Sequence, residues 1–113
     1  MNAEIFDRSV RSLGDLGGFF EYDGETAYFY LFDHRRPEGH KVVGAIHVTS
    51  KRPDFGKDDV RVEWDTSETT VGLLIKGELW AAFSADGKKY GGHYEPDARP
   101  YIPDAIALSF RTE

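Results

Sequence analysis

The alternating residues His93, Glu95 and Asp97 are the first group whose types and spacing could do chemistry. In an extended segment, side chains at alternate positions point the same way, so one imidazole and two carboxylates could hold a divalent metal. Pro96 and Arg99 lie in the same stretch and are typical of a solvated loop. Because spacing alone does not make a metal site, we predict no metal and no cofactor here.

A catalytic centre finds little support elsewhere in the chain. Asp33-His34 has the residue types of a general-base pair, but it borders Arg35-Arg36-Pro37, where a charged surface turn is the commoner outcome. The chain has no cysteine, which excludes thiol nucleophiles, disulfides and cysteine-bound zinc. It also lacks a nucleophile elbow, a phosphate-binding loop and a dinucleotide fingerprint. We therefore predict a non-catalytic protein with no catalytic residues.

Aromatic residues at Tyr28, Phe29 and Tyr30 could form a stacking surface for single-stranded nucleic acid. The charge opposes this function, because 20 acidic and 14 basic residues give a formal net charge of −6. We expect no nucleic-acid partner. One alternative stays open, a small-ligand-binding module or minor enzyme that uses an aromatic pocket at Tyr28 and Tyr30 together with His93 and Glu95.

Acidic residues are concentrated between residues 54 and 68, where only Lys57 and Arg61 carry positive charge. Alternation along 60–64 places Glu63 and Asp65 on the exposed face of a half-buried strand. A solvated face is the commoner meaning of such a run, and the functional alternative is a docking surface for a basic protein. An exposed Trp80 would strengthen that surface, since tryptophan is enriched among interface hot spots. The predicted partner-binding residues are thus Asp54, Asp58, Asp59, Glu63, Asp65, Glu68 and Trp80.

The elements that must position these residues are mostly β. Residues 3–13 place Ile5, Phe6, Val10 and Leu13 near a helical spacing, which predicts a short N-terminal helix. From Gly17 onward the period changes to two and turn signals recur every eight to twelve residues or so. This rhythm predicts an antiparallel meander or sandwich of about seven strands.

Chain length predicts one domain, because 113 residues are too few for two independent cores. We divide it into an N-terminal helical segment (1–16), a β core (17–96) and a C-terminal extension (97–113). Alternating Ile106, Leu108 and Phe110 make the extension a possible last strand, and a helical turn is equally compatible.

Two hairpins carry clear turn signals. Asp23-Gly24 predicts a two-residue loop that pairs Tyr22 with Glu25, and Gly77-Glu78 predicts another in the hairpin that runs from Leu73 to Phe83. Both faces of the second hairpin are apolar. It must therefore be central to a sandwich, capped by the N-terminal helix, or covered by another chain.

Strand and turn residues over about 17–96 resemble a small family of uncharacterised bacterial proteins, a domain of unknown function. The resemblance is carried by the runs Glu25–Tyr30, Val43–Val48, Val60–Trp64, Val71–Gly77 and Ala81–Phe83. It implies a bacterial β-rich domain and transfers no catalytic residue.

These observations lead to the hypothesis of a non-catalytic bacterial domain that binds another protein, possibly a basic one, in the manner of an immunity or antitoxin-like factor. The first residues carry both signs of charge and precede no apolar segment, so we expect no signal peptide, no membrane partner and a cytoplasmic location. A second alternative is a homodimeric structural domain built through the two-sided apolar hairpin.

Overall fold

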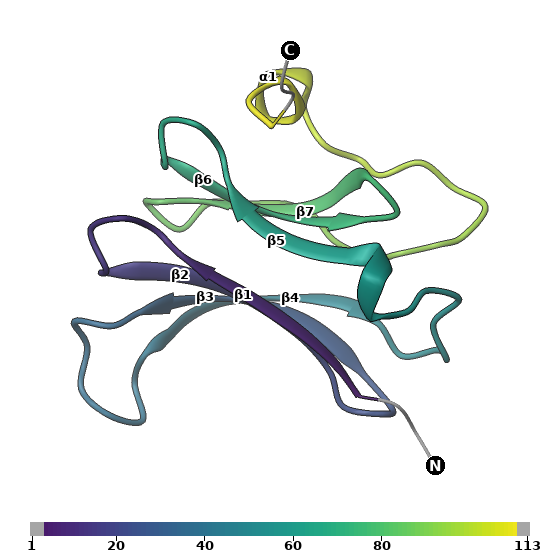
Figure 1. Cartoon of the computed structure of the whole chain (residues 1–113), viewed down its shortest axis with the longest axis horizontal. Helices are drawn as coiled ribbons and strands as arrows, with labels where there is room; N and C mark the ends of the chain where they lie inside the picture. The colour runs from purple at the N-terminus through teal and green to yellow at the C-terminus, as the bar shows by residue number, and fades with distance from the viewer. Residues whose placement is uncertain (1–3, 111–113) are drawn as a thin grey trace.

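Two four-stranded antiparallel sheets stack face to face in the computed structural model, which describes residues 4–110 (Figure 1). Each sheet is a meander in which neighbours in sequence are neighbours in space. The first sheet contains β1 (Ile5–Val10), β2 (Leu16–Tyr22), β3 (Ala27–Asp33) and β4 (Val42–Thr49). A short 3-10 turn, η1 (Lys57–Asp59), leads to the second sheet, which contains β5 (Val60–Trp64), β6 (Thr70–Ile75), β7 (Glu78–Ser84) and β8 (Lys89–Gly91). The chain then forms α1 (Asp104–Leu108).

The core lies between the sheets and is made by the alternate residues that face inward. Phe20, Phe29 and Leu31 of the first sheet meet Leu73 and Phe83 of the second, and all five are fully buried. The rings of Phe29 and Phe83 are 5.3 Å apart across the interface. A shared apolar core of this kind is what makes two one-sided sheets stable together.

Hydrogen bonds join the two sheets at both edges. At the β1–β5 edge, the Val62 amide donates to Asp7 Oδ2 at 2.7 Å, and Trp64 Nε1 donates to the Ser9 carbonyl at 3.0 Å. At the opposite edge, the Tyr94 amide donates to the Val48 carbonyl at 2.7 Å. Some of the unpaired backbone groups at these edges thereby find partners within the chain.

The predicted N-terminal helix is wrong, because residues 5–10 form β1. Alternation is present, but of the inward positions only Ile5 is apolar. Asp7 and Ser9 face inward to bond the edge of β5, whereas Phe6 and Val10 are exposed on the outer face. The count of about seven strands is also low by one, since this extra strand makes eight within residues 4–110.

The hairpin registers differ from the predicted ones. Tyr22 pairs with Ala27, because the Asp23 carboxylate accepts hydrogen bonds from the Glu25 and Thr26 amides and so forms a four-residue loop. In the second hairpin the loop residues are Lys76 and Gly77, both with positive φ, as a type I′ turn requires.

The apolar hairpin β6–β7 is covered on its second face by this chain's own C-terminal segment. A Cβ built on Gly72 would come within 2.8 Å of Phe110 Cζ, and one on Gly91 would contact Ile102. Figure 1 shows α1 on the side of the second sheet that faces away from the first. Of the two forms open for 106–110, the structure has a helix that ends at Leu108. Within residues 4–110, no helix is long and apolar enough to cross a membrane.

Candidate functional site

The residues of the predicted acidic surface do not all lie together in the folded protein. Asp65 is the first of those that lie elsewhere. Its side chain is buried, which contradicts its expected place beside Glu63 on an exposed face. Asp65 Oδ1 accepts hydrogen bonds from the Thr69 and Thr70 amides at 3.0 and 3.2 Å. A carboxylate that closes its own turn in this way has a structural role.

Glu68 is turned toward the N-terminal hairpin. Its two carboxylate oxygens accept from the amide and the hydroxyl of Ser12, at 3.0 and 2.9 Å. The Glu68 backbone lies in the left-handed region, with φ of 58°, and its carbonyl accepts from Arg11. Glu68 therefore helps to join the two sheets.

Asp54 and Trp80 meet at Tyr94. The Tyr94 hydroxyl donates to Asp54 Oδ1 at 2.7 Å, and Lys76 approaches the other oxygen at 3.2 Å. These bonds hold the pKa of Asp54 below its usual range, whereas burial, followed by the bond to Asp54, raises the pKa of Tyr94. Trp80 is buried with its ring 4.7 Å from that of Tyr94, so it is unavailable as an exposed hot spot.

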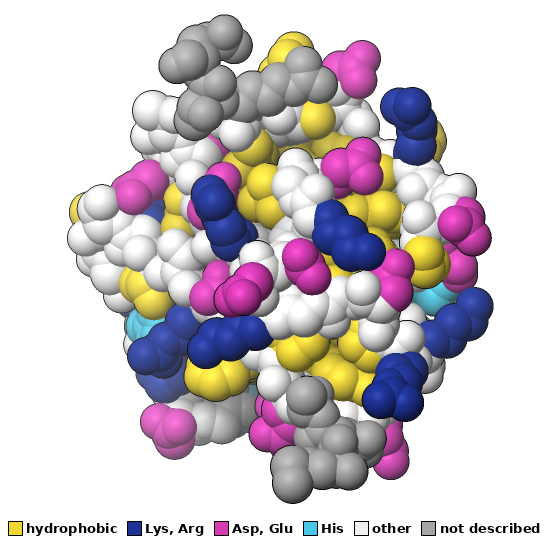
Figure 2. Space-filling view, turned by 45° about the vertical axis from the view of Figure 1, so that its right-hand side comes forward, with side chains coloured by type: hydrophobic (Ala, Val, Ile, Leu, Met, Phe, Trp, Pro, Cys, Tyr) yellow, Lys and Arg dark blue, Asp and Glu magenta, His cyan; other side chains and the backbone are white. Residues whose placement is uncertain are grey.

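Asp58, Asp59 and Glu63 remain together. They line a hollow of about 500 Å³ that is also lined by Arg61 and Lys76. Arg61 pairs with Glu63 at 2.7 Å. The face shown in Figure 2 likewise has acidic and basic side chains interspersed rather than one continuous acidic area.

The residues of the ligand-binding alternative do form contacts. The Tyr28 and Tyr30 rings stack at 5.8 Å, and His93 Nε2 lies 2.8 Å from Glu95 Oε1. This contact and nearby Lys51 lower the pKa of Glu95. In the described part of the chain, no three His, Asp or Glu side chains are placed to share a metal.

Tyr28 and Tyr30 belong to a larger array of rings on the outer face of the first sheet. Centroids of successive rings lie 5.2–6.3 Å apart, from Phe6 to Phe19 to Tyr30 to Tyr28 to His47. We call this array the aromatic face; it comprises Phe6, Phe19, Tyr28, Tyr30, Phe32, His34, His47 and His93.

The aromatic face has no covering layer among residues 4–110, as Figure 1 shows for the outer side of the first sheet. Phe6 is 54% exposed, and Val10 and Val42 beside the array are also exposed. Partial burial raises the pKa of Tyr30. A contiguous exposed apolar surface of this kind marks an interaction site far more often than scattered apolar residues do.

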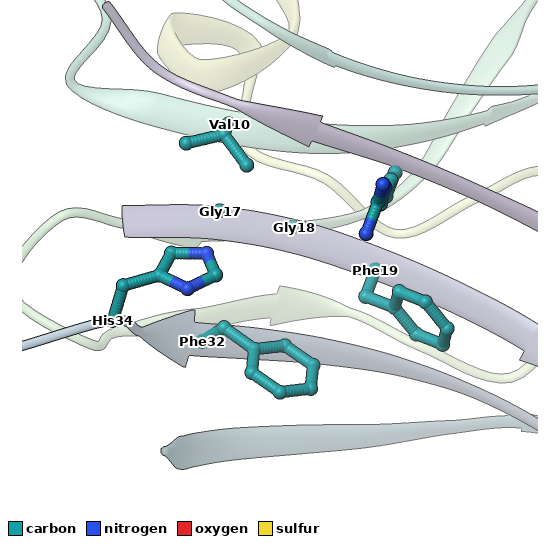
Figure 3. Close-up of a pocket in the computed structure, with 7 residues that line it drawn as sticks. Val10, Gly17, Gly18, Phe19, Phe32 and His34 are labelled. Atoms are coloured by element: carbon teal, nitrogen blue, oxygen red, sulfur yellow. The ribbon is translucent and has the colours of Figure 1, made fainter. Parts of the chain in front are cut away.

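A pocket opens at one end of this face, where the row of side chains across β1–β4 is Val10, Gly17, Phe32 and Val42. Gly17 contributes no side chain, and the gap has a volume of about 120 Å³. Figure 3 shows the rings of Phe19, Phe32 and His34 beside the glycine backbone. Tyr28, Tyr30 and His93 do not line it.

Sequence reasoning missed the pocket and five of the eight residues of the face. The available signal was a second alternation, Phe19 with Tyr28, Tyr30 and Phe32, out of phase with the core residues Phe20, Phe29 and Leu31. Phe6 joins this series only when residues 5–10 are a strand.

The chain was compared with known proteins at the levels of family, curated sequence and solved structure. The model of a family described as an uncharacterised protein conserved in bacteria, DUF2251, matches residues 2–94. No curated protein and no solved structure matches the chain. The matched region reaches further toward the N-terminus than the resemblance over 17–96 and includes all eight strands.

Proposed function

We propose, for a chain that belongs to this family of uncharacterised bacterial proteins, a non-catalytic binding function in which the aromatic face captures a partner protein. The observation that carries the proposal is the uncovered array of rings across all four strands of the first sheet. Aromatic residues and arginine are enriched at protein interfaces, and Arg8 lies directly opposite Phe19 on this face.

The size of the face limits the partner. Four strands at about 4.8 Å spacing and seven residues at about 3.3 Å each cover roughly 400 Å². A stable interface of standard size buries about 800 Å² on each partner. The face alone therefore suits a short segment of a partner, bound reversibly, better than a lasting homodimer.

The test is capture of host proteins by the immobilised full chain and by variants. Phe6→Ser removes the most exposed phenylalanine or tyrosine ring of the face, and Tyr30→Ser removes a central one. Tyr101→Ser is the matched control, because this ring is 91% exposed but lies in the C-terminal segment. We expect a protein retained by the wild type and by Tyr101→Ser, with recovery at least about tenfold lower for the face variants.

Equal recovery by all variants would contradict the proposal, provided that thermal unfolding shows each variant to be folded. Sedimentation at several concentrations tests whether the chain forms a homodimer. If the wild type self-associates and the face variants do not, the occupant is a second copy and the proposal of a different partner fails.

A second candidate function is the one expected from the sequence, in which the chain binds a basic protein in the manner of an immunity or antitoxin-like factor. The observation that favours it is the hollow in which Asp58, Asp59 and Glu63 still converge. Charge reversal at these three positions should then weaken capture and reduce its dependence on salt, while Phe6→Ser has no effect. The two candidates thus predict opposite sets of sensitive variants.

A further inference from the structure

The pocket at Gly17 is the part of the aromatic face with the most definite shape. Gly17 and Gly18 line it without side chains, and a Cβ on Gly17 would lie 3.1 Å from Val10 Cγ2 and 3.3 Å from the Ser9 carbonyl oxygen. Its walls are rings, because Phe32 lies edge-on to Phe19 at 5.7 Å and is stacked against His34 at 6.2 Å. Flat apolar walls around a glycine gap suit a flat apolar group.

The volume of the Gly17 pocket indicates the size of the group that can enter it. A closed cavity of about 150 Å³ holds a benzene molecule. The Gly17 pocket has about 120 Å³ and is open on one side, so it can take one six-membered ring that is partly covered. Phenylalanine and tyrosine side chains carry such a ring.

The charge around the pocket is opposite to that of the whole chain. Arg8 lines the pocket, and among residues 4–110 no carboxylate lies within salt-bridge distance of it. His34 begins the β3–β4 loop, in which residues 34–41 carry three Lys or Arg and one Glu. Arg35 of this loop is paired with Asp33, and Arg36 and Lys41 against Glu38 leave one positive charge in excess. Complementary charge on a partner would therefore be negative.

We propose that the Gly17 pocket is an anchor site for a phenylalanine or tyrosine side chain flanked by carboxylates on a partner protein. This inference rests on the proposed function and assigns the chemistry of the segment that the aromatic face captures. The ring enters the gap at Gly17, beside Phe19 and Phe32, and the flanking carboxylates lie toward Arg8 and the β3–β4 loop.

The test is an NMR titration of the full chain with three blocked tripeptides, acetyl-Glu-Phe-Glu-amide, acetyl-Lys-Phe-Lys-amide and acetyl-Glu-Ala-Glu-amide. We expect the first to shift the amide signals of Gly17 and Gly18. We expect the other two to bind at least about tenfold more weakly, since one lacks the anionic groups and the other lacks the ring.

Two variants with matched controls locate the site. Gly17→Val should abolish the shifts by filling the pocket, whereas Gly56→Val should not, because Gly56 faces open space with an extended backbone. Arg8→Glu should remove the preference for the acidic peptide, and Arg52→Glu, the same change on an exposed loop residue, should retain it.

Equal affinity for all three peptides, or unchanged binding by Gly17→Val, would overturn the anchor site. These outcomes are separate from failure of the proposed function. If capture of a host protein still depends on Phe6 and Tyr30 while the peptides do not bind, only the anchor site is wrong. If the peptides bind but recovery of a host protein does not depend on Phe6 and Tyr30, the proposed function is wrong and the pocket remains a site for acidic aromatic ligands.

Discussion

Substitution of Gly18 by alanine should destabilise the protein, because the two sheets approach closely at this glycine. A Cβ at Gly18 would lie 2.6 Å from Val71 Cγ2 and 3.0 Å from Val62 Cγ1, with Phe29 at 3.3 Å. All three side chains are buried, so none can move into solvent. Overpacking of a core by a methyl group costs about 1–3 kcal/mol. For a chain of this length, that loss lowers the melting temperature by about 4–12 °C, which calorimetry or circular dichroism would measure.

The adjacent Gly17 supplies the control, because it lies on the same strand but on the opposite face. A Cβ there approaches only Val10 Cγ2 and the Ser9 carbonyl within 3.4 Å, and Val10 is 46% exposed and free to shift. Gly17→Ala should stay within about 0.5 kcal/mol of the wild type. A second control combines Gly18→Ala with Val71→Ala, which removes the obstructing methyl. The loss of stability in this double variant should be about 1 kcal/mol less than the sum of the two single losses. An equal loss at Gly17 and Gly18, or strict additivity with Val71→Ala, would refute this packing argument.

Three further predictions concern polar contacts and the C-terminal segment. Asp65→Ala should cost about 1–3 kcal/mol in chemical denaturation because the Thr69 amide and its neighbour lose a buried acceptor, and Asp65→Asn, which keeps one acceptor oxygen, should cost less. The bond from Arg35 lowers the pKa of Asp33 to about 2. The stability that this carboxylate contributes is therefore present above its unfolded pKa of about 4 and is lost as the pH falls through about 2. A carboxyl NMR titration should show the low pKa of Asp33 and its return toward the normal value in Arg35→Ala. Phe110→Ala should lower stability by about 1–2 kcal/mol and increase binding of a hydrophobic dye, because the outer face of the second sheet becomes exposed; an unchanged dye signal would show that Phe110 is not its cover.

Most of the β architecture could be predicted from alternation, whereas β1 could not. A strand is recognised when its apolar side chains share one face, and β1 faces the core side with Asp7 and Ser9. The Asp7 carboxylate is tolerated there because it accepts a hydrogen bond from the Val62 amide of β5, 55 residues away, and Ser9 accepts one from Trp64 of the same strand through its backbone carbonyl. Local spacing contains no information about that partner, so Ile5, Phe6 and Val10 resemble a helical stripe instead.

The acidic surface shows the same limit at the level of the site. Alternation placed Asp65 beside Glu63, but the strand ends at Trp64 and the next residue turns inward to bind the amides that follow it. Nearness in sequence also joined Asp54 to Glu68, although folding directs one carboxylate to Tyr94 and the other to Ser12. The aromatic face arises in the opposite way, because residues scattered from Phe6 to His93 converge only through the sheet register.

The meander order of the sheets has a consequence for how the chain folds. Every strand pair within a sheet joins neighbours in sequence, so each sheet can grow by successive local hairpins with little loop-closure entropy. Contacts such as Asp7 with Val62 span 55 residues and require both sheets to exist first. We therefore expect docking of the sheets to be the late step, and Asp7→Ala to speed unfolding while leaving the folding rate nearly unchanged.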